Sequence, residues 1–271
     1  MKSAKYVYSV ENVSDFEMRY YFSNSADEEQ AKIYPHHVHD RLEFYVLLEG
    51  DVSFAVESTV YKLKAGDVVI TKPNEMHNCI LEKNSVHKHA CFWFDSTSAF
   101  WFGDFLSRDF GKDNVISPDS KSKKRLLEIY KEIEELSNTQ DKRRRYLLAL
   151  EMLEILRKFL KEENTEKILP INLKNVLDYV DKNFNNIKNL TEITNKFYIS
   201  QSTLNRMFKK HLKTTPKSYL ETKRLAYSRR LLRQGVSVYN ACMESGFSDY
   251  SNYIRLFKSR FNITPKQYQD E

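Results

Sequence analysis

Cysteine is scarce in this sequence. The chain of 271 residues has three cysteines, Cys79, Cys91 and Cys242, and no two of them form a C-x-x-C pair. This wide spacing excludes a disulfide framework and a zinc knuckle. It is typical of a protein that works in the reducing cytoplasm.

Long apolar runs are missing as well. The sequence has no stretch of about 18 apolar residues, which is the length that a membrane-spanning helix needs. The first residues, MKSAKYVYSVEN, lack the apolar centre of a signal peptide. We therefore expect a cytoplasmic protein without a membrane partner.

Acidic side chains are few in the C-terminal part of the chain. Residues 168–271 hold 18 Lys and Arg against 8 Asp and Glu, a net charge of +10, whereas residues 1–167 hold 25 against 29, a net charge of −4. A basic segment of about a hundred residues is typical of a polyanion binder. The length and the unequal charge predict two domains.

The first 95 residues contain short β-branched and aromatic runs, separated by turn signals such as Glu49-Gly50-Asp51. The runs are FEMRYYF, LEFYVLL, VSFAVE, VYKL, DVVIT and HACFWF. Their rhythm predicts a small antiparallel barrel or sandwich, which we assign to residues 1–110.

From about Asp119 the apolar period changes to that of a helix. Two stripes result, Leu126, Ile129, Tyr130, Ile133 and Leu136, then Leu147, Leu150, Leu153, Leu156 and Leu160. We assign residues 111–167 to a helical connector, whose stripes either cap the barrel or form the seam of a dimer. The charged segment 161–167 marks the expected domain boundary.

Residues 168–271 are predicted to be helical and contain a repeat. Phe257-Lys258 and Thr264-Pro265-Lys266-x-Tyr268 repeat Phe208-Lys209 and Thr215-Pro216-Lys217-x-Tyr219 at an offset of 49 residues, which Arg206 and Arg255 share. One structural unit has therefore been used twice. We expect helix pairs at about 190–212 and 238–261, joined by a long helix over 217–232.

The second helix of each pair has an apolar face, with Leu204 and Phe208 in one copy and Tyr253 and Phe257 in the other. A helix-turn-helix unit reads the major groove with the opposite, polar face. The candidate DNA-contacting side chains are Ser202, Asn205, Arg206, Lys209, Ser251, Asn252, Arg255 and Lys258. Arg and Asn can hydrogen-bond base edges, whereas Lys is better suited to phosphates.

Thr191, Ser200 and Ser248 stand where helices of these pairs are expected to begin. A hydroxyl at the N-cap accepts a hydrogen bond from a free backbone N–H. Helix N-termini also attract phosphates, so we assign these three residues to the phosphate contacts.

Residues 173–268 resemble the DNA-binding domain of AraC/XylS-type transcription regulators. The motifs that carry the resemblance are Ser200-x3-Leu204-x-Arg206-Met-Phe208-Lys209, Tyr219-x4-Arg224-Leu225 and Gly246-Phe247-Ser248-Asp249 through Arg255 to Tyr268. The resemblance implies two recognition helices that enter successive major grooves, about 34 Å apart. Lys213 and Asn262 stand where the family commonly has a turn glycine, so we expect the turn at Lys213 to be reshaped.

Polar residues between Pro35 and His77 are regularly spaced. They are His37, His39, Glu43, Gly50, Gly66, Asp67 and His77. This spacing resembles the two cupin motifs, although Asn74 and Leu81 depart from the second one. In metal-binding cupins the matching histidines and glutamate hold a divalent ion, and such ligands suit Zn, Fe, Mn or Ni.

Barrels attached to AraC-type domains resemble ligand sensors, in which the same polar residues hold a small effector. On this interpretation the effector contacts are His37, His39, Glu43, Tyr45, His77 and Trp93. Aromatic walls beside a few polar groups suit a small ligand such as a sugar. Effector contacts, a bound divalent metal and plain interior packing stay open as alternatives.

The sequence thus predicts an α+β protein with a cupin-like antiparallel β-barrel and amphipathic helices, followed by an all-α DNA-binding domain with two helix-turn-helix units. We expect a sequence-specific transcription regulator, an activator, that responds to an effector without catalysis or a required cofactor. Its other expected partners are RNA polymerase and a second copy of the chain. The alternatives are a metal-dependent cupin enzyme fused to a DNA-binding domain and a nucleoid-type DNA binder.

Overall fold

The computed structural model describes residues 7–13, 16–23, 36–81, 87–94, 99–137, 141–160 and 169–270. The chain forms two compact units, whose main boundary in the sequence falls at Leu169, and residues 36–38 are grouped with the second unit. The charged segment 161–167, where we expected the boundary, lies outside the described residues. Among the described helices, none is both long enough and apolar enough to cross a bilayer.

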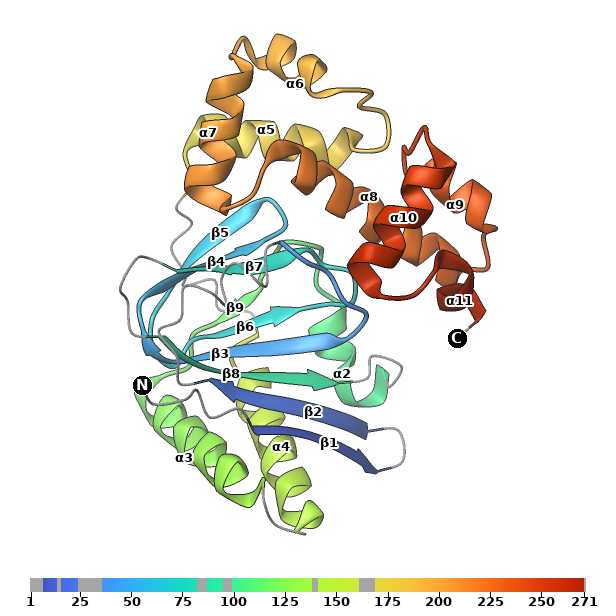
Figure 1. Ribbon diagram of the computed structural model, residues 1–271. Helices are drawn as coiled ribbons and strands as arrows, with labels where there is room; N and C mark the ends of the chain where they lie inside the picture. Colours follow the sequence, from blue (N-terminus) through green and yellow to red (C-terminus); the bar gives the residue numbers. More distant parts are fainter. Residues whose placement is uncertain are drawn as a thin grey trace, which may run out of the picture. The chain divides into compact units, whose positions relative to one another are not determined.

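Two antiparallel sheets build the first unit (Figure 1). The larger sheet has the strand order β1-β2-β8-β3-β6-β9 and the smaller one β5-β4-β7. The strands are β1 (Val7–Val13), β2 (Phe16–Ser23), β3 (Leu42–Gly50), β4 (Val52–Val56), β5 (Thr59–Leu63), β6 (Val68–Thr71), β7 (His77–Ile80), β8 (His87–Phe94) and β9 (Val115–Ile116). The sheet-rich antiparallel fold is confirmed. The described strands of one sheet do not pair with those of the other, so the expected barrel is not closed.

Strand β3 separates two apolar layers, because successive side chains of a strand point to opposite faces. Phe44 and Val46 pack in one cluster together with the helices of this unit. Tyr45 packs in another cluster with Phe54 of the smaller sheet. Glu43 has the same parity as Tyr45, so its carboxylate also lies on the side that faces the smaller sheet.

Three helices cover the other face of the larger sheet, α2 (Ala99–Leu106), α3 (Ser120–Leu136) and α4 (Lys142–Arg157) (Figure 1). The predicted stripe of α3 is buried from Leu126 to Ile133. On α4 the stripe is shifted, because Leu148, Met152 and their neighbours face the sheet. Leu147, the first residue of the predicted second stripe, is exposed. The two stripes therefore cap the sheet.

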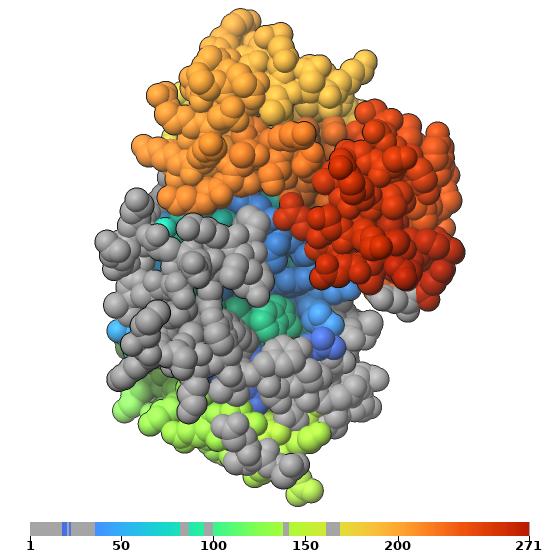
Figure 2. All heavy atoms as spheres, viewed as in Figure 1, coloured from blue at the N-terminus to red at the C-terminus, as the bar shows by residue number. Residues whose placement is uncertain are grey.

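The second unit consists of two helical lobes on either side of a long helix (Figure 1; Figure 2). Its helices are α5 (Ile171–Asn183), α6 (Leu190–Phe197), α7 (Gln201–Leu212), α8 (Pro216–Arg233), α9 (Val238–Glu244), α10 (Tyr250–Phe261) and α11 (Pro265–Asp270). Thr215 caps α8 and Pro216 occupies its first turn, where proline is favourable. The predicted helix pairs and the joining helix are confirmed.

Two residues tie the lobes of this unit together. Arg224 of α8 donates hydrogen bonds to the carbonyl oxygens of Phe184, at 2.9 Å, and of Ile187, and its guanidinium lies over the ring of Phe247. Gly246 has a φ of +87°, and a Cβ at this position would lie 2.4 Å from the carbonyl oxygen of Asn185. Only a glycine fits both this backbone conformation and this close approach.

Candidate nucleic-acid interface and ligand site

Helices α7 and α10 have the same division into a buried and an open face. Leu204 and Phe208 of α7 are buried, as are Tyr253 and Phe257 of α10. The polar residues that we selected as DNA contacts are exposed or half-buried, with Ser202, Arg206, Lys209, Ser251, Arg255 and Lys258 exposed and Asn205 and Asn252 half-buried. Both helices thus present a polar face with an arginine and a lysine at equivalent positions.

The N-caps of these units correct two of the three predictions. Ser200 caps α7, and its hydroxyl accepts a hydrogen bond from the N–H of Thr203 at 3.1 Å. The cap of α6 is Asn189 rather than Thr191, which lies inside the helix. The cap of α10 is Asp249 rather than Ser248. An amide or a carboxylate caps as well as a hydroxyl, so residue type alone could not choose between neighbouring candidates.

One pair of predicted base-reading side chains is already organised. Arg255 donates a hydrogen bond to the Oδ1 of Asn252 at 2.8 Å, one turn away on α10. Asn252 also donates its backbone N–H to Asp249 at 2.9 Å. The two side chains therefore support each other at the N-terminal half of this helix, which is the part that a helix-turn-helix unit brings to the bases.

The turns around the recognition helices contain a residue that the sequence analysis missed. Lys213 and Asn262 end α7 and α10 with φ values of 54° and 60°, so both keep the left-handed turn and the expected reshaping at Lys213 is wrong. Tyr198 also has a left-handed φ, of 52°, between α6 and α7, and its side chain is 96% exposed. No local pattern marks an aromatic residue for such a turn.

In the first unit, the carboxylate of Glu43 is the centre of a polar cluster. Its Oε2 lies 2.5 Å from the Nε2 of His39 and 3.3 Å from the Nε2 of His77, and it accepts a hydrogen bond from the indole N–H of Trp93 at 2.9 Å. Glu43 lies on β3 and Trp93 on β8 of the larger sheet, whereas His77 begins β7 of the smaller one. His77 therefore reaches the cluster from the opposite sheet and not from a neighbouring strand.

The second ring nitrogen of each histidine contacts the main chain. The Nδ1 of His39 lies 3.1 Å from the carbonyl oxygen of Arg41, and the Nδ1 of His77 lies 2.8 Å from that of Glu75. Burial by itself raises the pKa of Glu43, but the hydrogen bonds from the two histidines outweigh it and hold this pKa well below its usual value. Burial lowers the pKa of His77, and the Glu43 carboxylate outweighs this and raises it.

A second group of rings lies beside this cluster. The hydroxyl of Tyr45 is hydrogen-bonded to the Nε2 of His87, and the His87 and His89 rings stack with centroids 4.4 Å apart. Burial lowers the pKa of His87 to about 4, and burial together with His87 lowers that of His89 to about 3. Both imidazoles are thus neutral at physiological pH and give this side of the site an uncharged, aromatic character.

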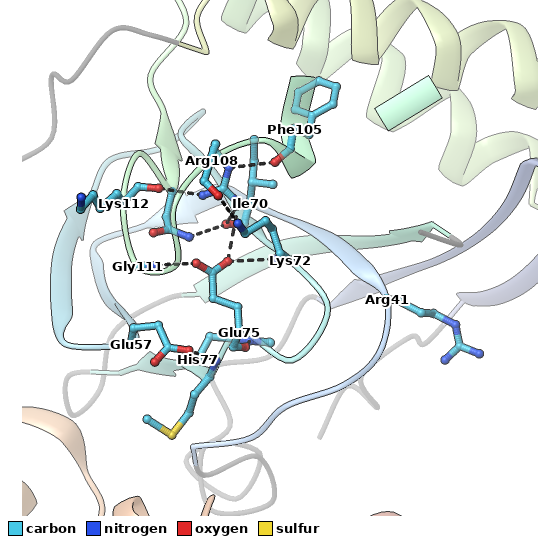
Figure 3. A network of polar contacts seen from close by, with 12 residues as sticks. Arg41, Glu57, Ile70, Lys72, Glu75, His77, Phe105, Arg108, Gly111 and Lys112 are labelled. Atoms are coloured by element: carbon cyan, nitrogen blue, oxygen red, sulfur yellow. Dashed lines mark hydrogen bonds and ion pairs between the residues drawn. The ribbon is translucent and has the colours of Figure 1, made fainter. Parts of the chain in front are cut away.

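The loop before His77 is anchored by a buried acid (Figure 3). Glu75 accepts hydrogen bonds from the backbone N–H groups of Lys72, at 2.8 Å, and Gly111, at 2.6 Å. It also forms an ion pair with Arg108 at 3.6 Å, and both side chains are almost completely buried. Glu75 thus joins the loop that carries His77 to the segment that follows α2, a role that its position in the sequence does not reveal.

Within the first unit, the structure brings together three of the four residues that we considered as metal ligands. One ligand atom of each of His39, Glu43 and His77 lies within 4.8 Å of the others, and His37 is grouped with the second unit. Of the other two predicted effector contacts, Trp93 donates a hydrogen bond to Glu43, and Tyr45 packs against Phe54, whose ring stacks on that of His77. Imidazole nitrogens with one carboxylate oxygen form a donor set for Zn, Fe, Ni or Mn.

Two family models match this chain. The first, described as an AraC-like ligand binding domain, matches residues 22–151. The second, described as a helix-turn-helix domain, matches residues 193–271. They correspond to the β-rich part and to the two helix-turn-helix units described above.

Among curated proteins, the chain is similar to the HTH-type transcriptional activator RhaS of Escherichia coli, with 32% identity over 123 residues, which is 45% of this chain and 44% of RhaS. The chain thus spans about half the length of the curated relatives it matches. A solved protein of unknown function from Listeria innocua is 28% identical over 37% of this chain and 96% of its own, with a TM-score of 0.35. The unsaturated-fatty-acid-bound ToxT of Vibrio cholerae is 15% identical over 96% of each chain, with a TM-score of 0.37.

The two family models lie in the order that the architecture requires, with the ligand-binding domain before the helix-turn-helix domain, and together they take in most of the chain. The chain therefore belongs to the family of AraC-type regulators.

Proposed function

We propose that the protein is a transcription regulator that binds a specific DNA sequence with α7 and α10 and responds to a small molecule held between the two sheets. One observation carries the DNA-binding part of this proposal. The two helices expose the same polar pattern on equivalent faces, and each is fixed to its lobe by buried aromatic and aliphatic side chains. A solvated face on one helix would need no explanation, but the same face twice in a basic unit fits two successive major grooves.

The roles of the side chains on these faces are separable by experiment. Arg255→Ala is expected to cost roughly 1–3 kcal/mol on the preferred DNA site and to relax base preference at one position. Lys258→Ala is expected to weaken binding to all sequences alike and to reduce the slope of log K against log salt by about one unit. Binding isotherms on matched and mismatched duplexes at several salt concentrations measure both effects.

A matched control is Lys131→Ala on α3, which removes one exposed positive charge outside the helix-turn-helix units. It is expected to leave the affinity for DNA within experimental error of that of the unaltered chain. If Arg255→Ala and Lys258→Ala weaken every duplex equally, the division into a base-reading arginine and a phosphate-binding lysine is wrong. Footprints of uniform protection with no preferred sequence would instead favour the nucleoid-type binder.

The ligand part of the proposal rests on the side chains that lie between the two sheets. They combine one buried carboxylate, that of Glu43, with the neutral rings of Tyr45, His87 and His89. Hydroxyl-rich ligands such as sugars use both kinds of group, since rings stack on their faces while polar atoms accept their hydroxyl hydrogens. A thermal-shift screen with sugars, fatty acids and small carboxylates tests this class, and a Tyr45→Phe variant should lose a shift that depends on the phenol hydroxyl.

We also propose that the protein activates transcription, as the transcriptional activator RhaS does according to its name, and therefore contacts RNA polymerase. A second copy of the chain is the other proposed partner, because Leu127 of α3 and Leu147 of α4 are exposed although both helices pack on the sheet. Light scattering on the purified chain measures its mass in solution. A dimer that becomes monomeric in Leu127→Glu or Leu147→Glu would place the interface on these helices.

A further inference from the structure

We propose that the first unit binds one divalent transition-metal ion at His39, Glu43 and His77. The proposal concerns the first unit alone and does not depend on the DNA-binding function. It follows from the way in which the histidine rings are oriented, from the spacing of their nitrogens and from the burial of the carboxylate.

The orientation of the two rings is the first step. A backbone carbonyl can only accept a hydrogen bond, so the Nδ1 of His39 and the Nδ1 of His77 must each carry the hydrogen that they donate to Arg41 and Glu75. In the neutral ring the Nε2 then has a lone pair that can bind a metal ion. Both Nε2 atoms lie close to the same carboxylate oxygen, the Oε2 of Glu43.

Two ring nitrogens that face one anionic oxygen need positive charge between them, which protons on the Nε2 atoms or one metal ion can provide. A metal ion supplies that charge, and metal-bound histidines characteristically donate their other ring hydrogen to a backbone carbonyl or carboxylate. Here both histidines are held in this way by carbonyls of the chain. The second sphere of a metal site is therefore already in place around His39 and His77.

The spacing agrees with a single ion. Two atoms that are bonded to one ion at about 2.1 Å lie about 3.0 to 4.2 Å apart, depending on the angle between the bonds. The Oε2 of Glu43 is 3.3 Å from the Nε2 of His77 and 2.5 Å from the Nε2 of His39, and the ligand atoms of these three residues lie within 4.8 Å of one another. Side-chain movements of about half an ångström bring all of them into range.

The donor set decides the class of ion. Ca²⁺ and Mg²⁺ prefer oxygen ligands and would find only one carboxylate here. Imidazole nitrogens favour Zn²⁺, Ni²⁺, Co²⁺ and Fe²⁺, with Mn²⁺ weaker in the usual order of stability. The indole N–H of Trp93 shares the Oε2 of Glu43, so its fluorescence provides a direct report of the site.

The loop anchored by Glu75 gives the site a rigid support. The carbonyl that orients His77 belongs to Glu75, and the carboxylate of the same residue is held by Gly111 and Arg108 (Figure 3). An ion that fixes His77 therefore also restrains the segment after α2. We expect the bound ion to raise the thermal stability of the first unit.

The test uses the full chain, freed of metal by a chelator and then dialysed. Calorimetric titration with Zn²⁺, Ni²⁺ or Co²⁺ should give one bound ion per chain, confirmed by elemental analysis, with a higher melting temperature and a changed Trp93 emission. Mg²⁺ and Ca²⁺ should give none of these changes. Changes in the second sphere of a metal site weaken binding about 10–100-fold, so loss of a direct ligand in His39→Ala or Glu43→Gln should weaken it by about 100-fold or more.

His211→Ala on α7 is the matched control and should bind the ion as the unaltered chain does. Glu43→Gln keeps the shape of the side chain, and His39 is only half-buried, so circular dichroism is expected to show folded variants. If protons alone fill the space between the histidines and Glu43, the unaltered chain takes up no ion, and this result overturns the proposal. Equal uptake by His39→Ala, Glu43→Gln and the unaltered chain overturns it as well. Failure of DNA binding, by contrast, leaves the metal result unchanged.

Discussion

Gly246 offers a direct test of how the two lobes of the helical unit are held together. In Gly246→Ala the new methyl group meets two separate obstacles. The φ of +87° is a left-handed conformation that costs an L-residue about 1–2 kcal/mol. The Cβ would also lie 2.4 Å from the carbonyl oxygen of Asn185 and 2.6 Å from its Cα, and both are backbone atoms that cannot rotate away. Overpacking of this kind costs about 1–3 kcal/mol.

The expected loss in the free energy of unfolding is therefore about 2–5 kcal/mol. Gly235→Ala is the matched control, since Gly235 has a φ of +82° but no atom within 4 Å of the position of its Cβ. It should lose only the conformational part, about 1–2 kcal/mol. Urea unfolding followed by circular dichroism at 222 nm, with hydrogen exchange of α6 and α9, measures both variants. Both tryptophans, Trp93 and Trp101, lie in the first unit. The urea unfolding transition followed by tryptophan fluorescence should therefore be the same in both variants as in the unaltered chain. Equal losses in the two variants would refute the close contact with Asn185.

Three further substitutions have outcomes that the structure fixes. Arg224→Met keeps the apolar stem but leaves two backbone carbonyls without their donor. The free energy of unfolding of the helical unit, measured in urea, should therefore fall by about 2–4 kcal/mol. A loss below about 0.5 kcal/mol would contradict the two hydrogen bonds. Glu75→Gln leaves Arg108 buried without a countercharge and should lower the free energy of unfolding of the first unit by about 3 kcal/mol, measured in urea by tryptophan fluorescence. An unchanged unfolding midpoint would show that the ion pair does not hold this loop. Tyr198→Asn places a residue that tolerates the left-handed turn at an exposed position and should stabilise the helical unit by about 1 kcal/mol, whereas a loss of stability would mean that the ring packs on its neighbours.

Local periodicity was enough to predict most of the elements. The run LEFYVLL became β3, and the stripe from Gln201 to Leu212 became α7 with the predicted cap at Ser200. The elements that the sequence hid are those with a weak local signal. Strand β9 has only two residues, and β7 begins with the polar pair His77-Asn78. Closure of a barrel depends on pairing between distant strands, which periodicity does not determine, and the described strands form two sheets instead.

The members of the polar cluster around Glu43 were predictable from the sequence, but its construction was not. The parity of β3 placed Glu43 and Tyr45 on one face, but His77 joins them from the smaller sheet through tertiary folding. The carbonyls that orient the histidines have no sequence signature at all, because every residue carries one. Glu75 was overlooked for the same reason, since a single glutamate in a loop is normally a solvated charge.

On the proposed function, the duplication makes the geometry between α7 and α10 important for DNA affinity. Each reading face alone would contribute a few base and phosphate contacts, and two faces reinforce each other only when they reach their grooves together. A flexible joint would lower the effective concentration of the second face near its groove. Helix α8, the hydrogen bonds of Arg224 and the approach of Gly246 to Asn185 replace such a joint by fixed contacts. Gly246→Ala should therefore weaken binding to the complete DNA site more than binding to a half-site, because a shift between the lobes spoils the spacing and leaves each face intact.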